Sequence, residues 1–164
     1  MEAKVISTLQ DLNLNVSIKG QITAESDLPT LQQMPIEKLV FNVEGIEYIN
    51  SGGVRKWILW MEQAKSLFPQ ATFRFEGVPS VLIKQAATIQ NFLPPGSSID
   101  SFTVPYFCES CSTSCEKTFR KGQDFKLPVD RQAFIKILTS ATCPTCKGPL
   151  EIDAIPEHYV LSIN

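Results

Sequence analysis

The chain has 164 residues, which suffice for one ordinary domain or two small ones. Hydrophobic residues make up 43% of it and charged residues 20%, and the net charge of −2 excludes a strong electrostatic attraction to nucleic acid or anionic lipid. No apolar run approaches the roughly 20 residues of a membrane span, and residues 1–16 lack a signal-peptide core, so we expect a cytoplasmic protein.

The first 104 residues alternate between strand patterns and helix patterns. Period-2 alternation or short buried runs predict strands at residues 5–9, 12–18, 38–43 and 71–76. Helical spacing or acidic first turns predict helices at residues 24–34, 54–68 and 79–89. Strands that alternate with helices favour parallel pairing. We therefore predict an α/β fold, a small mixed and mainly parallel sheet with helices on one face.

A strand-to-helix joint with the sequence EYINSGGVR lies at residues 47–55. Open α/β sheets place their ligand sites at such carboxyl ends of strands. The candidate residues of the joint are Asn50, Ser51, Gly52, Gly53, Arg55 and Lys56. Asn50 or Ser51 can cap the helix while the glycines shape the turn, or the glycines can let a partner or an anion approach the positive end of the helix. No glycine-rich nucleotide motif is present, so a cap, a docking surface and a phosphorylated Ser51 remain open.

Residues 3–102, with the runs YINSGGVRKW and EGVP between strands and helices, resemble the STAS domain. This family contains the bacterial anti-sigma factor antagonists and the cytoplasmic tails of sulfate transporters. The resemblance implies a four- or five-stranded sheet backed by helices, no catalysis, and a protein partner such as an anti-sigma-factor-type kinase. In the antagonists that kinase phosphorylates a serine at the position of Ser51, which breaks the complex. Asn50 replaces the family's usual Asp, and Gly52 replaces a second small residue, often Ser.

All five cysteines lie between residues 108 and 146. Two pairs, Cys108-x-x-Cys111 and Cys143-x-x-Cys146, have the spacing with which thiolates build a tetrahedral four-sulfur site. Such a closed site is structural, and we expect Zn²⁺, although iron of the rubredoxin type uses the same spacing. Disulfides would need an oxidising compartment. Cys115 is expected to be a spare thiol, although its spacing from Cys111 also allows it to replace Cys108 or Cys111 as a ligand.

Residues 105–164 are therefore predicted to form a zinc-ribbon-like module after a turn and linker at residues 93–98. An extended run at residues 99–107 leads into the first cysteine pair. A helix is expected at residues 130–140, inserted between the pairs, and extended strands at residues 152–163 would close the ribbon. His158 is expected at the surface or a strand edge.

The sequence contains no constellation of catalytic residues, so we expect no enzyme. The predicted function is a non-catalytic regulatory or signalling protein, with a STAS-like docking domain at residues 1–104 and a structural zinc ribbon at residues 105–164. The alternative is a nucleic-acid-binding or scaffolding protein that acts through the ribbon. Seven basic and seven acidic residues in that half argue against nucleic acid. A third class is an iron–sulfur electron carrier.

Overall fold

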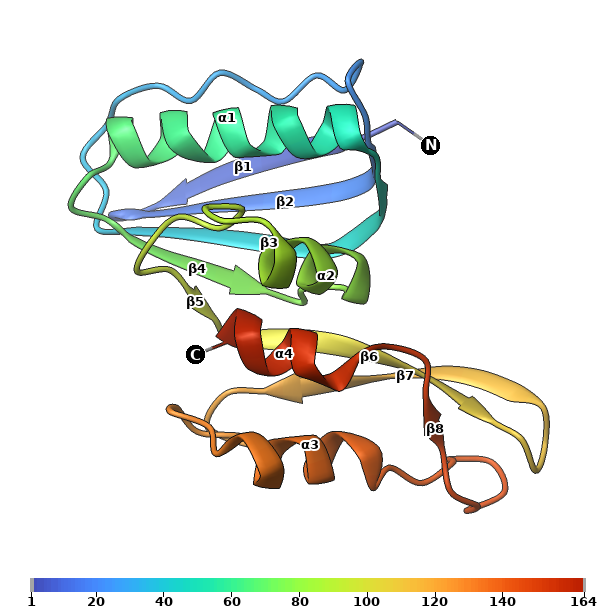
Figure 1. The fold of residues 1–164 in the computed structure, drawn as a ribbon. Helices are drawn as coiled ribbons and strands as arrows, with labels where there is room; N and C mark the ends of the chain where they lie inside the picture. The colour runs from blue at the N-terminus through green and yellow to red at the C-terminus, as the bar shows by residue number, and fades with distance from the viewer. Residues whose placement is uncertain (1, 164) are drawn as a thin grey trace.

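A computed structural model of the protein describes residues 2–163 (Figure 1). Its strands are β1 (Lys4–Gln10), β2 (Asn13–Ile22), β3 (Lys38–Ile49), β4 (Thr72–Glu76), β5 (Ser98–Ile99), β6 (Ser101–Cys108), β7 (Thr113–Arg120) and β8 (Glu151–Ile152). Its helices are α1 (Ser51–Leu67), α2 (Ser80–Thr88), α3 (Arg131–Thr139) and α4 (Pro156–Ile163). No helix within residues 2–163 is long and apolar enough to cross a membrane.

The first sheet has the strand order β1-β2-β3-β4-β5. β1 runs antiparallel to β2, and the other neighbours are parallel. The mixed α/β sheet predicted from the alternation of strands and helices is therefore confirmed. α1 and α2 cover one face of it (Figure 1). Every second side chain of β2, such as Val16 and Ile18, is buried on that face, whereas Asn15 and Ser17 between them are half-exposed.

Aromatic side chains fill the layer between the first sheet and α1. The ring of Trp57 is fully buried, 6.4 Å from the ring of Phe41 and 5.8 Å from that of Phe92. Its Nε1 donates a hydrogen bond to the Phe92 carbonyl oxygen at 2.9 Å, the kind of partner that a buried indole needs. These contacts fix α1 both to the sheet and to the chain that follows α2.

The helix predicted at residues 24–34 is wrong. This segment crosses from β2 to β3 without helical structure. Pro29 removes a backbone donor that a helix would need, and side chains of α1 bind the carbonyl groups that a helix would use internally. Lys56 Nζ donates to the Ser26 carbonyl oxygen, and Trp60 Nε1 donates to that of Pro29 at 2.8 Å.

The second sheet has the strand order β7-β6-β8 and is antiparallel. An aromatic cluster packs between this sheet, α3 and α4. Its members are Phe102, Phe119, Phe125, Phe134 and Tyr159. The hydroxyl of Tyr106 on β6 donates to the Leu138 carbonyl oxygen at 2.6 Å at the end of α3. The helix predicted at residues 130–140 is found, with Asp130 as its N-terminal cap.

The extended strands predicted for residues 152–163 are wrong beyond Ile152, the last residue of β8. α4 occupies most of this segment and begins at Pro156, whose missing N–H group costs nothing in the first turn of a helix. Tyr159, Val160 and Ile163 are buried on one side of it, with helical spacing. The half-buried His158 therefore lies on a helix rather than at a strand edge.

The two sheets meet without a flexible connection. The expected linker at residues 93–98 is a turn in which Pro94 is buried, and a single residue, Asp100, separates β5 from β6. The N–H group of Asp100 donates to the Phe75 carbonyl oxygen of β4, and its carbonyl accepts from the N–H group of Lys121 after β7, both at 2.8 Å. α4 lies beside α2 (Figure 1), and buried residues of both sheets form one continuous hydrophobic core.

Candidate functional site

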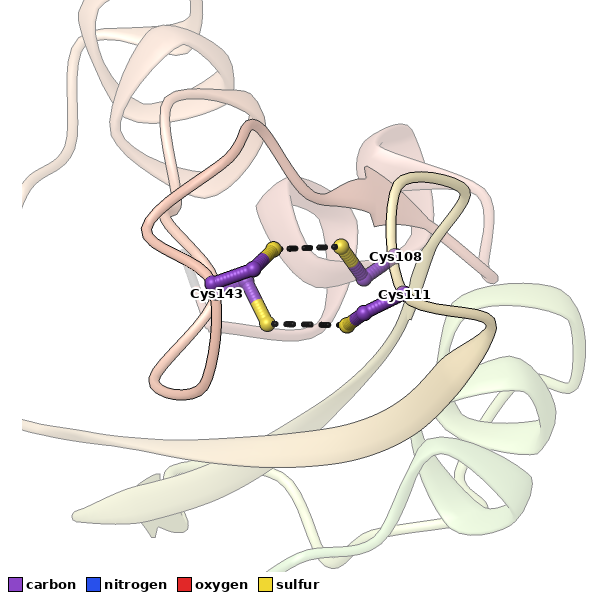
Figure 2. Close-up of side chains that lie close together, drawn as sticks. Cys108, Cys111 and Cys143 are labelled. Carbon is purple, nitrogen blue, oxygen red and sulfur yellow. Dashed lines mark hydrogen bonds between the residues drawn. The ribbon is translucent and has the colours of Figure 1, made fainter.

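Two hairpin tips bring four cysteines together at one end of the second sheet. The last ladder pair of β6 and β7 is Cys108 with Thr113, so Cys111 lies in the turn between these strands. The second tip lies after α3, where Thr142 bridges to Pro149 and encloses Cys143 and Cys146. Figure 2 shows the thiol groups of Cys108, Cys111 and Cys143 pointing toward the same small space. Each hairpin thus presents one cysteine pair to the other.

The sulfur positions fit a tetrahedral metal site. Cys108 Sγ lies 3.4 Å from Cys146 Sγ, and Cys111 Sγ lies 3.7 Å from Cys143 Sγ. All four sulfur atoms lie within 4.8 Å of one another. A metal that holds thiolates at about 2.3 Å in a tetrahedron separates them by about 3.8 Å, close to these values. A disulfide needs about 2.05 Å, so both cross-hairpin contacts are between free thiols.

The backbone around the second pair favours negative charge on sulfur. The N–H group of Cys146, helped by that of Thr145, lowers the pKa of the Cys143 thiol to about 6, although burial opposes the shift. The N–H group of Gly148 favours the Cys146 thiolate, but hydrogen bonds to the other three sulfurs raise the pKa of Cys146 to about 12. Four thiolates at these distances repel one another, so all four ionise together only around a cation.

The two cysteine turns share one backbone conformation. The residue after the second cysteine of each pair has a left-handed conformation, with φ of 52° at Ser112 and 63° at Lys147. Such a conformation costs a non-glycine residue about 1 kcal/mol or more. The second turn is further closed by the Cys143 N–H group, which donates to the Gly148 carbonyl oxygen at 2.8 Å. These matching turns aim the paired sulfurs in the same direction, which is what a shared metal requires.

The remaining thiol and the histidine lie elsewhere. Cys115 is the register partner of Tyr106 in the β6–β7 ladder, and its sulfur is outside the group of four. His158 on α4 lines a pocket of about 250 Å³ between α2 and α4, and it is not part of the cysteine group. The four sulfurs therefore form a possible metal-binding group without either residue. The geometry is consistent with a structural metal, because all four positions of a tetrahedron are filled by protein.

At the joint before α1, Asn50 and not Ser51 is the cap. Asn50 has an extended backbone, and its Oδ1 accepts a hydrogen bond from the Gly53 N–H group at 2.8 Å. Ser51 is the first helical residue and is exposed. The position of Ser51 at the positive end of α1 suits an added negative charge.

The two glycines of the joint are required by the chain itself. A Cβ atom on Gly53 would lie 2.1 Å from the Ile22 carbonyl oxygen, and one on Gly52 would lie 2.8 Å from the Ala24 Cβ. The end of β2 therefore occupies the space that the sequence interpretation left for a partner or an anion. Close packing of α1 on β2 explains both glycines without any ligand.

An open groove of about 550 Å³ runs beside the exposed side of α1. Its lining residues are Ala24, Asp27, Leu28, Gly52, Arg55, Lys56, Leu59, Trp60 and Gln63. Arg55 is exposed, whereas Lys56 is half-buried because its ammonium group binds the Ser26 carbonyl oxygen. Leu59 is a large apolar side chain of the lining that is 57% exposed. The lining thus combines apolar side chains with charges of both signs.

The sequence alone does not single out several of these groups. Asp27 and Leu28 fall within the segment predicted to be a helix. Leu59 lies on the polar side of the α1 pattern, where a single apolar residue carries no signal. The Cys111 thiol donates to Thr113 Oγ1 at 3.3 Å, and that hydroxyl donates to the Cys111 carbonyl oxygen at 3.2 Å. Nothing in the spacing of the cysteines marks Thr113.

Comparison of the chain with protein-family models and with curated proteins finds no match.

Proposed function

We propose that this protein is a non-catalytic regulator whose STAS-like half binds a protein partner through the groove beside α1, and whose second half is a zinc-ribbon-like module held by a structural Zn²⁺. The observation that carries the docking proposal is the groove itself, which is lined by exposed Leu59, by Trp60 and by Arg55. Its lining includes Gly52, the neighbour of Ser51. Aromatic residues and arginine are enriched in protein contacts relative to the rest of a protein surface.

Phosphorylation of Ser51 would act as the switch. A phosphate adds about −1.5 to −2 charge, and the positive helix end and exposed Arg55, one turn further along α1, both favour that charge. The fold therefore tolerates the modification, while a partner surface with acidic or apolar groups at this point does not. An anti-sigma-factor-type kinase is the partner class that the family resemblance suggests.

The test is capture of partners from native cell extract on immobilised protein, with Ser51→Ala as the matched control for Ser51→Asp. We expect Ser51→Ala to capture the same proteins as wild type. Ser51→Asp should capture each of these proteins in an amount at least about tenfold lower. Leu59→Asp, at an exposed side chain of the groove lining, should abolish capture of the same proteins. Equal capture by Ser51→Asp and wild type would disprove the switch, and equal capture by Leu59→Asp would disprove docking in the groove.

Both zinc and iron accept four thiolates in closed geometry. Zinc is proposed over iron because zinc needs no redox partner. The visible absorption spectrum of the purified protein distinguishes the two metals, because a four-thiolate iron site absorbs visible light and a zinc site does not. Metal analysis should return one zinc ion for each chain. The residues that would hold it are Cys108, Cys111, Cys143 and Cys146.

A further inference from the structure

The C-terminal helix α4 connects the cysteine group to the first sheet. The second cysteine turn continues through Leu150 and β8 directly into α4. On its other side α4 lies against α2, which belongs to the helix layer of the first sheet (Figure 1). One short segment therefore touches both the candidate metal site and the docking half of the protein.

Each step of this path has a defined contact. Leu150 is buried, and its N–H group donates to the Ala141 carbonyl oxygen at 3.0 Å, which closes the base of the second cysteine turn. Ile152 of β8 pairs with Tyr106 of β6, and the Asp153 N–H group donates to the Pro105 carbonyl oxygen at 2.9 Å. The position of the segment before α4 is thus set on β6, the same strand that carries Cys108.

α4 reaches the first sheet through side chains. The Ser162 hydroxyl lies 3.1 Å from the Ile83 carbonyl oxygen of α2 and 2.7 Å from the His158 carbonyl oxygen of its own helix, whereas the Tyr159 hydroxyl donates at 3.1 Å to the Thr103 carbonyl oxygen of β6, in the second sheet. The exposed end of the helix, Leu161, lines a pocket of about 230 Å³ with Phe92, the residue that stacks on Trp57. α4 thus covers part of the surface that α2 and the following turn would otherwise expose.

The elements on this path are too short to hold themselves. β8 has two residues and α4 has eight. Isolated helices below about 12–15 residues are marginal in water, and a two-residue strand has no independent stability. α4 therefore keeps its place only while its buried side chains and the anchored β8 act together. Separation of the two cysteine turns removes the second anchor.

We propose that metal bound by the four cysteines acts as a latch: it holds β8 on β6 and thereby keeps α4 closed over α2, and loss of the metal releases α4 from the first sheet. This inference rests on the proposed metal site. It adds that the metal's influence extends beyond the module that contains it, to α2, one of the two helices that cover the first sheet.

Hydrogen exchange on the full-length chain tests the latch. Reduced, metal-free protein is compared with the same protein after addition of one equivalent of Zn²⁺, with zinc content measured in each sample. Zinc should slow exchange of the α4 and α2 amides at least about tenfold, whereas amides of β2 in the middle of the first sheet should not change. Ser162→Ala should reduce the zinc effect on α2, and Glu157→Gln, at a side chain that is 45% exposed on the same helix and faces Arg131 of α3, should not.

Two results contradict the latch in different ways. If zinc binds and protects only the cysteine turns, β6 and β8, the metal site stands and the latch is wrong. If the reduced protein binds no zinc, the metal site proposed above fails and the latch fails with it. Asp153→Pro removes the N–H donor next to β8 while Asp153→Ala keeps it, so only the proline variant should weaken protection of α4 with zinc content unchanged.

Discussion

At the scale of single residues, Gly53 shows how tightly α1 is set on the first sheet. Its N–H group binds the Asn50 cap, and its missing side chain leaves room for the Ile22 carbonyl group. The same residue therefore satisfies the start of the helix and the end of a strand. The sequence indicates a cap at Asn50 or Ser51 but leaves open whether the glycines shape the turn or admit a ligand, because a glycine does not reveal what approaches it.

Gly53→Ala should destabilise the protein by about 2 kcal/mol or more, because the new Cβ atom would lie 2.1 Å from a backbone oxygen that cannot turn away. Helix propensity alone predicts the opposite sign, a gain of about 1 kcal/mol. Urea unfolding measures the difference. The exposed helix position Ser66→Ala is the control and should change stability by less than about 0.5 kcal/mol. A neutral or stabilising Gly53→Ala would show that α1 and β2 do not approach this closely.

Two buried tyrosines make the protein sensitive to alkali. Burial, with a smaller contribution from the nearby Cys115, raises the pKa of Tyr106 to about 12, and burial also raises the pKa of Tyr159. The folded state therefore favours the neutral phenols, and this stabilisation is fully present below pH 10 and is lost as the pH rises toward 12. The Tyr106 hydroxyl can donate to the Leu138 carbonyl only while it is protonated.

Tyr106→Phe should cost about 1 kcal/mol at pH 8, the value of one buried hydrogen bond. Above pH 10 the difference between wild type and variant should shrink, because only wild type loses a stabilised phenol there. The check is the unfolding free energy of both proteins in urea from pH 8 to pH 11.5. A difference that stays constant over this range would contradict the assigned pKa shift.

At the scale of elements, the two cysteine hairpins depend on each other. The turns that carry the four thiols lie at one end of the second sheet, and Cys108 and Cys143 are buried in the same core as its aromatic cluster. Metal binding in small modules contributes on the order of 10 kcal/mol to folding. Metal removal should therefore cost more than the loss of any single buried side chain in this half.

Cys111→Ser should abolish stoichiometric zinc binding and unfold the second sheet, while Cys115→Ser should keep one zinc ion for each chain. The two variants remove the same atom from the same hairpin and differ only in whether the sulfur belongs to the group of four. Metal analysis gives the stoichiometry, and circular dichroism with and without a chelator gives the folding effect. Loss of zinc from Cys115→Ser would mean that the ligand set is different.

The elements that sequence reasoning missed were decided by distant contacts. Residues 24–34 carry acidic residues where a helix would start, yet Lys56 and Trp60 bind backbone carbonyls of this segment from α1. No local pattern can report that competition. Residues 152–163 differ, because their helix has a local signal. Ile and Val side chains suggest strands there, but Pro156 followed by the spacing of Tyr159 and Ile163 indicates a helix. The cysteine pairs were predictable because metal ligation imposes its own local spacing.

At the scale of the whole molecule, the two halves share one core, so the zinc-loaded protein should unfold in a single step. Both tryptophans lie in α1, so their fluorescence follows the first half, whereas far-ultraviolet circular dichroism follows all elements. The two signals should give coincident urea transitions with zinc. With a chelator, the fluorescence transition should come at higher urea than part of the dichroism change. Separate transitions in the zinc-loaded protein would contradict a shared core.

Asp100, between β5 and β6, restricts how the two sheets can move relative to each other. Its N–H group is bound to β4, its carboxylate pairs with Arg74 and accepts from the Ser98 hydroxyl, and its carbonyl is bound to the chain after β7. A single residue with bonds on both sides cannot serve as a swivel. We therefore expect the molecule to tumble in solution as one particle with one rotational correlation time, and a partner bound at the proposed α1 groove would also fix the orientation of the cysteine hairpins.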